Sequence, residues 1–323
     1  MATPVLFVGP LERVLHVKTH PALAGLGSRE LAAVAQHARE RHFTRGAVLL
    51  SRDERAEAFF LLVKGRVELR SPGNAPSVVS AGSAIAFLEL LARSGAGLEA
   101  RALGSGLALE LDWQAQLDVC EEHFPVLLEY VRYVAAGGLR ELERLPDGTW
   151  LARHEPVVAP GRPLNLVERI LTLRQAKAFS TGSIDALAEL ARACSELRCS
   201  AGEPLWRCGD PSSFFLLVAA GTVTCTTADG RRLHQQGSAL AVGLNEAVIG
   251  EPRWNDAVAR SELVALRIDL GGFLDALEEH FDLAVDFLSV MARRLMELRD
   301  RAASGDPATG LSPAAPRPPA SGP

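Results

Sequence analysis

The chain has 323 residues, which is enough for two ordinary domains that each bury their own core. Its 48% hydrophobic and 23% charged residues are typical of a soluble globular protein. A formal net charge of −5 excludes a strong overall attraction to nucleic acid, although a basic face can still exist within an acidic total.

The cysteines and the N-terminus indicate the compartment. Five cysteines are an odd number without disulfide-framework spacing, which favours a reducing compartment: Cys120, Cys194, Cys199, Cys208 and Cys225. The apolar run at residues 5–8 is too short for a signal peptide or a membrane span, and no later segment has eighteen uninterrupted apolar residues. We therefore expect a cytoplasmic protein without membrane contact.

The most informative feature is an internal repeat. Residues 11–15 (LERVL) match residues 167–171 (VERIL), 156 positions later. At the same separation, Gly46 meets Gly202 and Gly65 meets Gly221, whereas the FFLLV runs at 59–63 and 214–218 match at 155. The segment EEHF at 121–124 returns at 278–281, 157 positions later. This order of matches predicts one architecture used twice.

Each copy is predicted to open with a helix, at residues 28–39 and 183–197, where Ser28 and Ser183 are expected as N-caps. Short strands separated by glycine turns follow in the first copy at 46–50, 59–63, 65–69 and 77–79. A last strand ends at Asp112 in the first copy and at Asp269 in the second. A helix then closes each copy.

The closing helix of the second copy has the most regular apolar pattern. Eight apolar residues at alternating separations of three and four form a heptad seam: Leu274, Leu277, Phe281, Ala284, Leu288, Met291, Leu295 and Leu298. The seam either packs on its own barrel or pairs with a partner, which includes a homodimer through helix 274–298. In the first copy, Gly137 and Gly138 are expected to loosen or end the equivalent helix.

The composition between and after the copies sets the domain boundaries. Residues 146–166 are rich in Pro and Gly and are predicted to be a linker, and residues 302–323 are predicted to be a disordered Pro/Ala-rich tail. The predicted domains are therefore 11–145 and 167–301.

The order of these elements resembles the cyclic-nucleotide-binding domain, the family of the catabolite-activator-type bacterial regulators and of the regulatory subunits of cAMP-dependent kinases. The local matches are FFLLVKGRVEL at 59–69, FFLLVAAGTVTC at 214–225, and the turn Cys208-Gly209-Asp210. The resemblance implies a mainly β fold with flanking helices (α+β): two tandem double-stranded β-helix (jelly-roll) barrels of eight strands, each with an N-terminal helical segment and a closing helix.

The resemblance also implies a ligand site, a phosphate-binding cassette with a Gly-Glu pair, a short helix and a later arginine. Amides at a helix N-terminus and a guanidinium are natural partners of a cyclic phosphate, and the carboxylate accepts a ribose hydroxyl proton. The implied ligand is a cyclic nucleotide such as cAMP or cGMP, and no other cofactor or metal is expected.

In the first copy the cassette departs from the family pattern. Phe87-Leu88-Glu89 stands where the family has Phe-Gly-Glu, so Leu88 replaces the glycine and Glu89 remains. Ala96 occupies the place of the arginine, and Arg93 lies nearby but earlier in the chain. Without the glycine and the guanidinium, the first copy is expected to bind no cyclic nucleotide.

In the second copy, Pro252-Arg253 takes the family's Pro-Arg place. One register places Glu246 opposite Glu89 as the carboxylate; another keeps Gly243 as the glycine and puts Leu244 at the glutamate position. Glu251 lies beside Arg253 in sequence and could neutralise it. The candidate ligand residues are Gly243, Glu246, Pro252 and Arg253; the alternative is that Arg253 is a solvated loop residue.

Two functional hypotheses follow. The first is a non-enzymatic regulatory or adaptor protein that senses a nucleotide-like ligand in its second domain, with a protein partner downstream. The second is a tandem scaffold with two degenerate pockets that acts through protein–protein contacts. The sequence contains no nucleophile-elbow, Walker-type or metalloprotease motif. Direct DNA binding is not expected, because only 25 Pro-rich residues follow Leu298.

Overall fold

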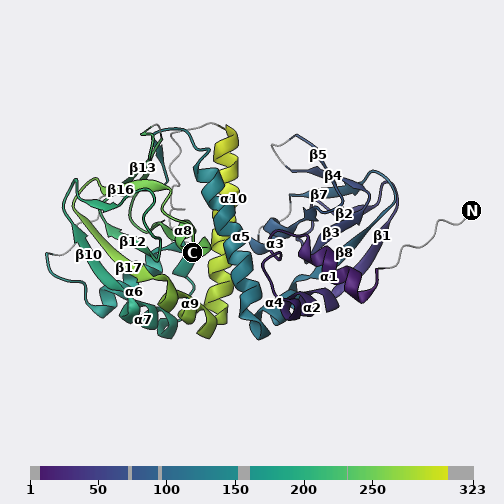
Figure 1. Ribbon diagram of the computed structural model, residues 1–323, viewed down its shortest axis with the longest axis horizontal. Coiled ribbons are helices and arrows are strands. Elements are labelled where there is room, and N and C mark those ends of the chain that lie inside the picture. Colours follow the sequence, from purple (N-terminus) through teal and green to yellow (C-terminus); the bar gives the residue numbers. More distant parts are fainter. Residues whose placement is uncertain (1–7, 72–74, 94–96, 152–160, 231, 305–323) are drawn as a thin grey trace, which may run out of the picture. The chain divides into compact units, whose positions relative to one another are not determined.

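The computed structural model describes residues 8–71, 75–93, 97–151, 161–230 and 232–304 (Figure 1). The chain divides into two compact units, each of which draws on two stretches of sequence. Unit 1 contains residues Met1–Val134 and Phe287–Met296, and unit 2 contains Ala135–Asp286 and Glu297–Pro323. Each unit therefore combines one β-barrel with a piece of the closing helix of the other repeat.

The first repeat begins with two helices, α1 (Pro10–Lys18) and α2 (Ser28–Gln36). Its barrel strands are β1 (Ala38–Phe43), β2 (Val48–Leu50), β3 (Ala58–Lys64), β4 (Arg66–Arg70), β5 (Ser77–Ser80), β6 (Ala84–Ile85), β7 (Glu99–Ala102) and β8 (Gly106–Asp112). A short helix, α3 (Phe87–Leu91), lies between β6 and β7, and α4 (Trp113–Glu122) and α5 (Phe124–Leu142) close the repeat.

The second repeat has the same order. It begins with α6 (Leu166–Gln175), a 3-10 turn (Lys177–Phe179) and α7 (Ile184–Ala193). Its barrel strands are β10 (Ser195–Cys199), β11 (Pro204–Trp206), β12 (Phe214–Ala220), β13 (Val223–Thr227), β14 (Leu233–Gln236), β15 (Ala241–Val242), β16 (Asn255–Ala259) and β17 (Leu263–Asp269). The short helix α8 (Leu244–Ile249) precedes β16, and α9 (Leu270–Glu279) and α10 (Phe281–Ser304) close the repeat.

Each barrel is built from two antiparallel sheets. In the first barrel the sheet orders are β1-β8-β3-β6 and β2-β7-β4-β5. The second barrel has the equivalent sheets β10-β17-β12-β15 and β11-β16-β13-β14, and the latter gains β9 (Thr149–Trp150) at its edge. The predicted fold, two tandem eight-stranded β-rolls with flanking helices, is confirmed.

The strand register corrects the alignment of the two apolar FFLLV runs. Phe59 pairs with Leu111 at the end of β8, and Phe215, not Phe214, holds the corresponding place opposite Ile268 in β17. The runs therefore match at 156 positions, like the turn glycines. A slip of one residue would turn every side chain of the strand to the opposite face. With the observed register, Phe60 and Leu216 both join the apolar core inside their barrels.

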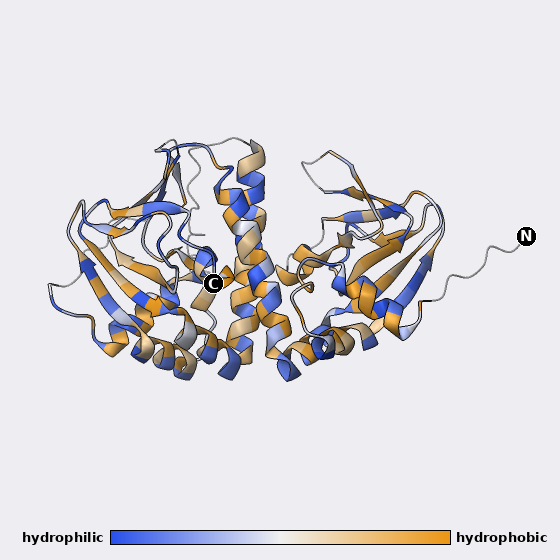
Figure 2. Ribbon diagram, viewed as in Figure 1, coloured by the Kyte–Doolittle hydropathy of each residue, from blue (hydrophilic) through white to orange (hydrophobic). Residues whose placement is uncertain are grey.

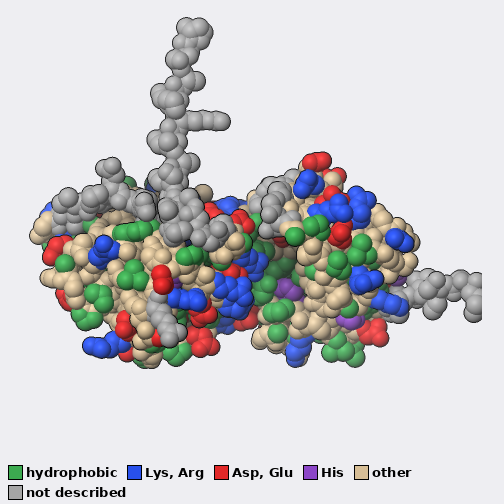
Figure 3. All heavy atoms as spheres, turned by 90° about the horizontal axis from the view of Figure 1, so that it is seen from above, with side chains coloured by type: hydrophobic (Ala, Val, Ile, Leu, Met, Phe, Trp, Pro, Cys, Tyr) green, Lys and Arg blue, Asp and Glu red, His purple; other side chains and the backbone are tan. Residues whose placement is uncertain are grey.

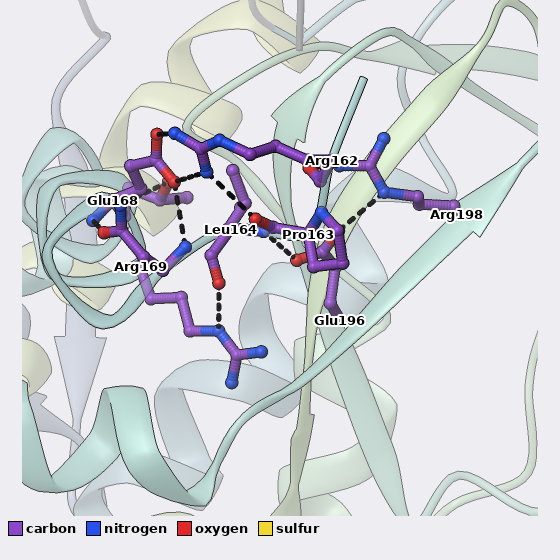
Figure 4. Close-up of polar contacts among 9 residues, drawn as sticks. Arg162, Pro163, Leu164, Glu168, Arg169, Glu196 and Arg198 are labelled. Carbon is purple, nitrogen blue, oxygen red and sulfur yellow. Dashed lines mark hydrogen bonds and ion pairs between the residues drawn. The ribbon is translucent and has the colours of Figure 1, made fainter. Parts of the chain in front are cut away.

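A repeated arginine fastens the first helix of each repeat to its barrel. In unit 2, Arg169 of α6 donates to the carbonyl oxygens of Leu164 and Cys194, at 3.2 and 2.8 Å. In the same cluster Glu196 accepts a hydrogen bond from the Leu164 N–H. Arg162 forms a bidentate ion pair with Glu168 (Figure 4).

Unit 1 contains the same arrangement 156 positions earlier. Arg13 donates to the carbonyl oxygens of Val8 and Ala38, and Glu40 accepts the Val8 N–H. The repeat therefore extends beyond the apolar core to individual, partly buried hydrogen bonds.

The opening helices are shorter than predicted. Helix α2 ends at Gln36 and α7 at Ala193, so the residues that follow belong to strands β1 and β10. Ser183 caps α7 through a bond from the Ala186 N–H, as predicted. The predicted cap at Ser28 is wrong, because Gly27 is the N-cap of α2.

The prediction that Gly137 and Gly138 loosen the first closing helix is also wrong. Helix α5 continues to Leu142 with both glycines buried. A Cβ atom at Gly138 would lie 3.0 Å from the Asn245 side-chain nitrogen on α8. The missing side chain therefore permits close packing, and this packing compensates for the low helix propensity of glycine.

Six of the eight residues of the heptad seam of α9 and α10 are buried within one chain, and Leu274 and Phe281 are half-buried. The exposed fraction is 1% at Leu288 and Leu295 and 2% at Leu298. In unit 1, Arg293 of α10 donates to the Ala92 carbonyl at the end of α3. In unit 2, Leu298 packs in an apolar cluster with Leu142, Leu145 and Leu151. Hydrophobic and hydrophilic residues alternate along α10 (Figure 2), and Leu283, Val285 and Phe287 outside the seam are also buried.

The segment predicted as a linker is structured at its start. Strand β9 pairs in parallel with β14, with Thr149 opposite His234 and Trp150 opposite Gln235. Residues 152–160 of the predicted linker and 305–323 of the predicted disordered tail lie outside the described residues. The described end of the chain, through Ser304, continues helix α10.

Candidate functional site

The stretch between β15 and β16 forms a short helix between two left-handed glycines. Gly243 precedes α8 with φ +79°, and Gly250 follows it with φ +76°. In the first barrel Ala86 precedes α3 with φ +64°, 157 positions before Gly243. Positive φ favours glycine because it lacks a Cβ atom. The residue that replaces the family glycine in the first copy is therefore Ala86 and not Leu88 as predicted.

This equivalence places each cassette residue. Leu244 is the first residue of α8, as Phe87 is the first residue of α3. Glu246 and Glu89 are equivalent, each in the first turn of its helix. The geometry thus favours the register in which Gly243 is the cassette glycine and Leu244 follows it.

Arg253 is enclosed in the second barrel, and its whole residue is only 1% exposed. Its guanidinium donates to the Gly243 carbonyl at 2.8 Å and to the Phe214 carbonyl. The Gly243 contact is so close that an added Cβ atom would lie 2.2 Å from Nη1 of Arg253. The alternative of a solvated loop arginine is therefore wrong.

Two aromatic rings contact the guanidinium, and their planes are nearly perpendicular to one another. The Arg253 Cζ atom lies 4.1 Å from the centre of the Trp206 ring and 4.8 Å from that of Phe214. Arg267 stacks on Phe214 at 3.6 Å, so two arginines share that ring. The indole N–H of Trp206 donates to Asn255 Oδ1 at 3.3 Å, which fixes the ring over Arg253.

Glu246 is the charged partner of Arg253. Its Oε1 lies 3.5 Å from Arg253 Nη1, and its side chain is 3% exposed. Oε1 of Glu246 and Nε of Arg253 are both buried without a hydrogen-bond partner. Burial raises the pKa of Glu246, and burial lowers the pKa of the Arg253 guanidinium, so the apolar surroundings oppose the charge of both side chains.

The backbone around Arg253 joins the cassette to the Gly-Asp turn. The Arg253 N–H donates to the Asp210 carbonyl at 2.9 Å, and its carbonyl accepts the Gly209 N–H at 2.8 Å. Pro252 and Glu251 are exposed, and the ion pair of Arg253 is formed with Glu246 rather than Glu251. The structure therefore brings Gly243, Glu246 and Arg253 together and leaves Pro252 at the surface.

In the first barrel an aromatic cluster takes the place of charged groups. Phe87, at the start of α3, makes edge contacts with Phe59, Tyr130 and Tyr133, and its ring centre lies 4.6 Å from that of His20. Glu89 is half-buried on α3, and Ala96 lies outside the described residues. The described part of this cassette contains no arginine in a place equivalent to Arg253.

The sequence did not identify the residues that enclose Arg253. Trp206, Phe214 and Asn255 come from three strands, and no spacing in the sequence connects them. One difference between the two repeats in sequence could have indicated Trp206. At the position of Trp206 the first repeat has Leu50, and both residues are buried in strands at the same place in their barrels.

The charged side chains on one face of the molecule are of both signs. On the face shown in Figure 3, basic and acidic side chains are interspersed. Within the described residues, no helix is both long and apolar enough to cross a membrane.

Comparison with known proteins identifies the domains. The model of the family described as "Cyclic nucleotide-binding domain" matches residues 40–123 and 196–280, together more than half of the chain. A search of curated proteins finds no match.

Solved structures with a similar arrangement include regulatory subunits of protein kinase A. The regulatory domain of the Toxoplasma gondii kinase, solved with cAMP, is 13% identical; the match covers 88% of this chain and 96% of that chain, with a TM-score of 0.34. The regulatory subunit of a cAMP-independent protein kinase A from Trypanosoma brucei is 15% identical. That match covers 91% of this chain and 89% of that chain, with a TM-score of 0.33.

A bacterial domain matches over a shorter stretch. The N-terminal domain of a Streptomyces coelicolor transcriptional regulator is 27% identical, over 40% of this chain and 95% of that domain, with a TM-score of 0.36. Two family matches, two β-rolls of the same topology and one cassette helix in each lead to one conclusion: the chain belongs to the cyclic nucleotide-binding domain family and contains two copies of that domain.

Proposed function

We propose that this protein is a non-enzymatic regulatory or adaptor protein whose second domain senses a small phosphate-bearing ligand of the cyclic-nucleotide class. The observation that carries the proposal is the buried Arg253–Glu246 pair in the cassette of that domain. Each partner retains a buried polar atom without a hydrogen bond. Such groups are costly to bury and gain most from a partner with complementary charge and hydrogen-bonding groups.

Gly243, Glu246 and Arg253 have distinct roles in this proposal. Gly243 allows the backbone to turn into α8 and leaves room for the guanidinium. Arg253 would pair with the phosphate, and Glu246 would accept a hydroxyl proton of the ligand. Pro252 shapes the loop before Arg253 and is not expected to contact the ligand directly. In this proposal the first domain, which has Phe87 in an aromatic cluster, is not a ligand site.

A specific observation favours the second candidate, a tandem scaffold without a ligand. Arg253 already has two carbonyl acceptors, an ion pair and two aromatic rings. In addition, Leu244 stands where the family carboxylate is expected. In the scaffold hypothesis these contacts replace the ligand, and the protein acts through partner proteins alone.

Titration calorimetry with a panel of cyclic mono- and dinucleotides distinguishes the two. We expect one site per chain, and we expect Arg253→Ala to weaken binding by about 30- to 1,000-fold, because a buried ligand charge loses a partner worth roughly 2–4 kcal/mol. Arg207→Ala, which removes an exposed arginine of the neighbouring turn, is the control and should bind normally. Arg253→Lys keeps the charge without the fork and should fall between them. Absence of binding to the whole panel would favour the scaffold.

Three further features remain predictions: a cytoplasmic location, a protein partner, and a homodimer through helix 274–298. The homodimer is the most constrained, because the apolar seam of that helix is buried within one chain. Pairing between chains would have to use the polar residues of the helix or release it from its own unit.

A further inference from the structure

The enclosure of Arg253 is a feature of its side chains and not of the barrel fold. Trp206 and Phe214 lie against the guanidinium, and we refer to these two rings as the aromatic cover. The cover leaves the Arg253 side chain with 0% exposure. The Gly243 and Phe214 carbonyls and the Glu246 carboxylate also contact the guanidinium. An anion from solution therefore reaches it only when the cover and some of these contacts open.

Trp206 is the part of the cover that the structure fixes most firmly. It is 6% exposed, packs against Phe214 at 6.1 Å between ring centres, and donates its indole N–H to Asn255. Asn255 is itself 4% exposed and begins β16, two residues after Arg253. The indole is thus bonded to the same segment that carries the arginine.

The first barrel shows that the fold does not need a tryptophan here. Its strand β2 pairs with β7 as β11 pairs with β16, and Leu50 holds the place of Trp206. Leu50 is buried at 8% exposure in an apolar core. The tryptophan accompanies the buried arginine, since the first repeat has Leu50 in place of Trp206 and Ala96 in place of Arg253.

We propose that Trp206 is an internal cover that sets the affinity of the second domain for a phosphate anion by holding Arg253 closed. This inference rests on the function proposed above. Ligand binding requires the indole to leave the guanidinium, and the apparent affinity falls by the fraction of molecules in which Arg253 is free. Trp206 thereby determines which ligands bind. Only an anion whose contacts with Arg253 compensate for the lost contact between Arg253 and the indole ring can bind.

The expected size of the effect follows from the contact that is lost. A cation–π contact excluded from water contributes about 2 kcal/mol, which corresponds to about 30-fold in an equilibrium constant. Trp206→Leu, the residue of the first barrel, should raise the affinity for a phosphate ligand by about that factor. Trp150→Leu is the matched control, because Trp150 also lies beneath an arginine, Arg260 at 5.5 Å, but outside the cassette.

The first arm of the test needs no ligand. Phenylglyoxal, which modifies accessible arginine side chains, is added to the full-length protein, and peptide mass spectrometry measures the rate at Arg253. We expect slow modification in the wild type and in Trp150→Leu, and at least tenfold faster modification in Trp206→Leu. Equal rates at Arg253 in the wild type and Trp206→Leu would overturn the proposal.

The second arm measures binding of the panel of cyclic mono- and dinucleotides by calorimetry in the same three proteins. Tighter binding by Trp206→Leu alone supports the cover, whereas weaker binding would mean that Trp206 contacts the ligand and would overturn it. If Arg253 becomes reactive in Trp206→Leu and no variant binds any cyclic nucleotide, the cover stands and the proposed ligand function fails.

A second variant guards against loss of folding in Trp206→Leu. Asn255→Ala removes the acceptor of the indole N–H and leaves the ring in place. It should raise the modification rate of Arg253 in the same direction by a smaller factor. A wild-type rate in a folded Asn255→Ala protein, as judged by circular dichroism, would contradict the account of how Trp206 is held.

Discussion

At the scale of single residues, the main feature is a charged pair in an apolar barrel. Arg253 and Glu246 are 1% and 2% exposed, and their separation of 3.5 Å is longer than a good charge-assisted hydrogen bond. A buried pair of this kind is weak evidence for stability, because desolvation offsets much of the attraction. We therefore attribute the pair to function.

Single and double replacement of the pair tests this attribution. Arg253→Met leaves Glu246 buried without a cation, so we expect it to lower the free energy of unfolding by about 3–5 kcal/mol. Adding Glu246→Gln removes the uncompensated charge and should restore most of that loss. Urea unfolding of the three proteins measures both effects. A double variant as unstable as Arg253→Met would show that packing, and not charge, controls stability here.

A second residue makes stability depend on pH. Burial among aromatic rings lowers the pKa of His20 to about 4, and its Nδ1 accepts the Ala22 N–H at 3.3 Å. The unfolded chain, with a histidine pKa near 6.5, binds more protons than the folded chain between pH 6.5 and 4. The contribution of His20 to the free energy of unfolding is therefore fully present above pH 6.5. It is lost as the pH decreases to 4, by up to about 3 kcal/mol.

Unfolding measured at several pH values checks this dependence. His20→Leu should remove this component of the slope between pH 6.5 and 4, whatever its effect on stability at neutral pH. An unchanged slope in the variant would assign the pH dependence to other groups.

At the scale of elements, two turn glycines separate the backbone strain of a side chain at positive φ from the steric clash of its Cβ atom. Gly202 and Gly221 lie in the same barrel, and both have φ +89°. A Cβ atom at Gly202 would meet nothing within 4 Å, whereas one at Gly221 would lie 2.2 Å from the Glu262 carbonyl oxygen. Gly202→Ala therefore carries the backbone cost alone, and Gly221→Ala adds a steric clash with another strand.

The expected destabilisation differs accordingly. Gly202→Ala should cost about 1–2 kcal/mol, the usual penalty for a side chain in the left-handed region. Gly221→Ala should cost at least about 2 kcal/mol more, because backbone atoms must shift. Denaturant unfolding of each variant and of the wild type measures the two losses of free energy of unfolding. Equal losses would mean that the β12–β13 turn moves without strain.

The elements also show what could be predicted from the sequence. The repeat, the strand order and the closing helices follow from glycine turns and apolar patterns, which are local. The helix boundaries at Gln36 and Ala193 were missed, because a helix that runs directly into a strand leaves no glycine or proline at the junction. Helix α5 continues through Gly138 because of tertiary packing against Asn245, which no local propensity reports.

The candidate site was predicted in part. Gly243, Glu246 and Arg253 lie together as expected, since they belong to one continuous segment. The aromatic cover was not predicted, because Trp206, Phe214 and Asn255 meet only when three strands are assembled. The one-residue error in the FFLLV match has the same origin, because strand pairing, and not local similarity, sets the register.

At the scale of the whole molecule, each compact unit contains part of the other repeat's closing helix. Leu288, 1% exposed, belongs to unit 1 although its helix follows the second barrel. Leu288→Glu places a charge in an apolar environment and should lower the free energy of unfolding by at least about 3 kcal/mol. Ala303→Glu, at an exposed position of the same helix, is the control and should change stability little.

Light scattering on the same variants tests the predicted homodimer. Because the seam is buried in one chain, Leu288→Glu should affect stability first and oligomeric state only through unfolding. A variant that keeps its stability and converts a dimer to a monomer would show that the seam pairs between chains.

We propose that the second cassette is the ligand site and that the first cassette binds no ligand. Hydrogen–deuterium exchange with and without a saturating cyclic nucleotide tests it most directly, because exchange rates locate the protected amides along the chain. We expect slower exchange at residues 243–253, with unchanged rates at the equivalent residues 86–96 of the first cassette. Protection at 86–96, or no protection anywhere in the presence of any cyclic nucleotide, would contradict it.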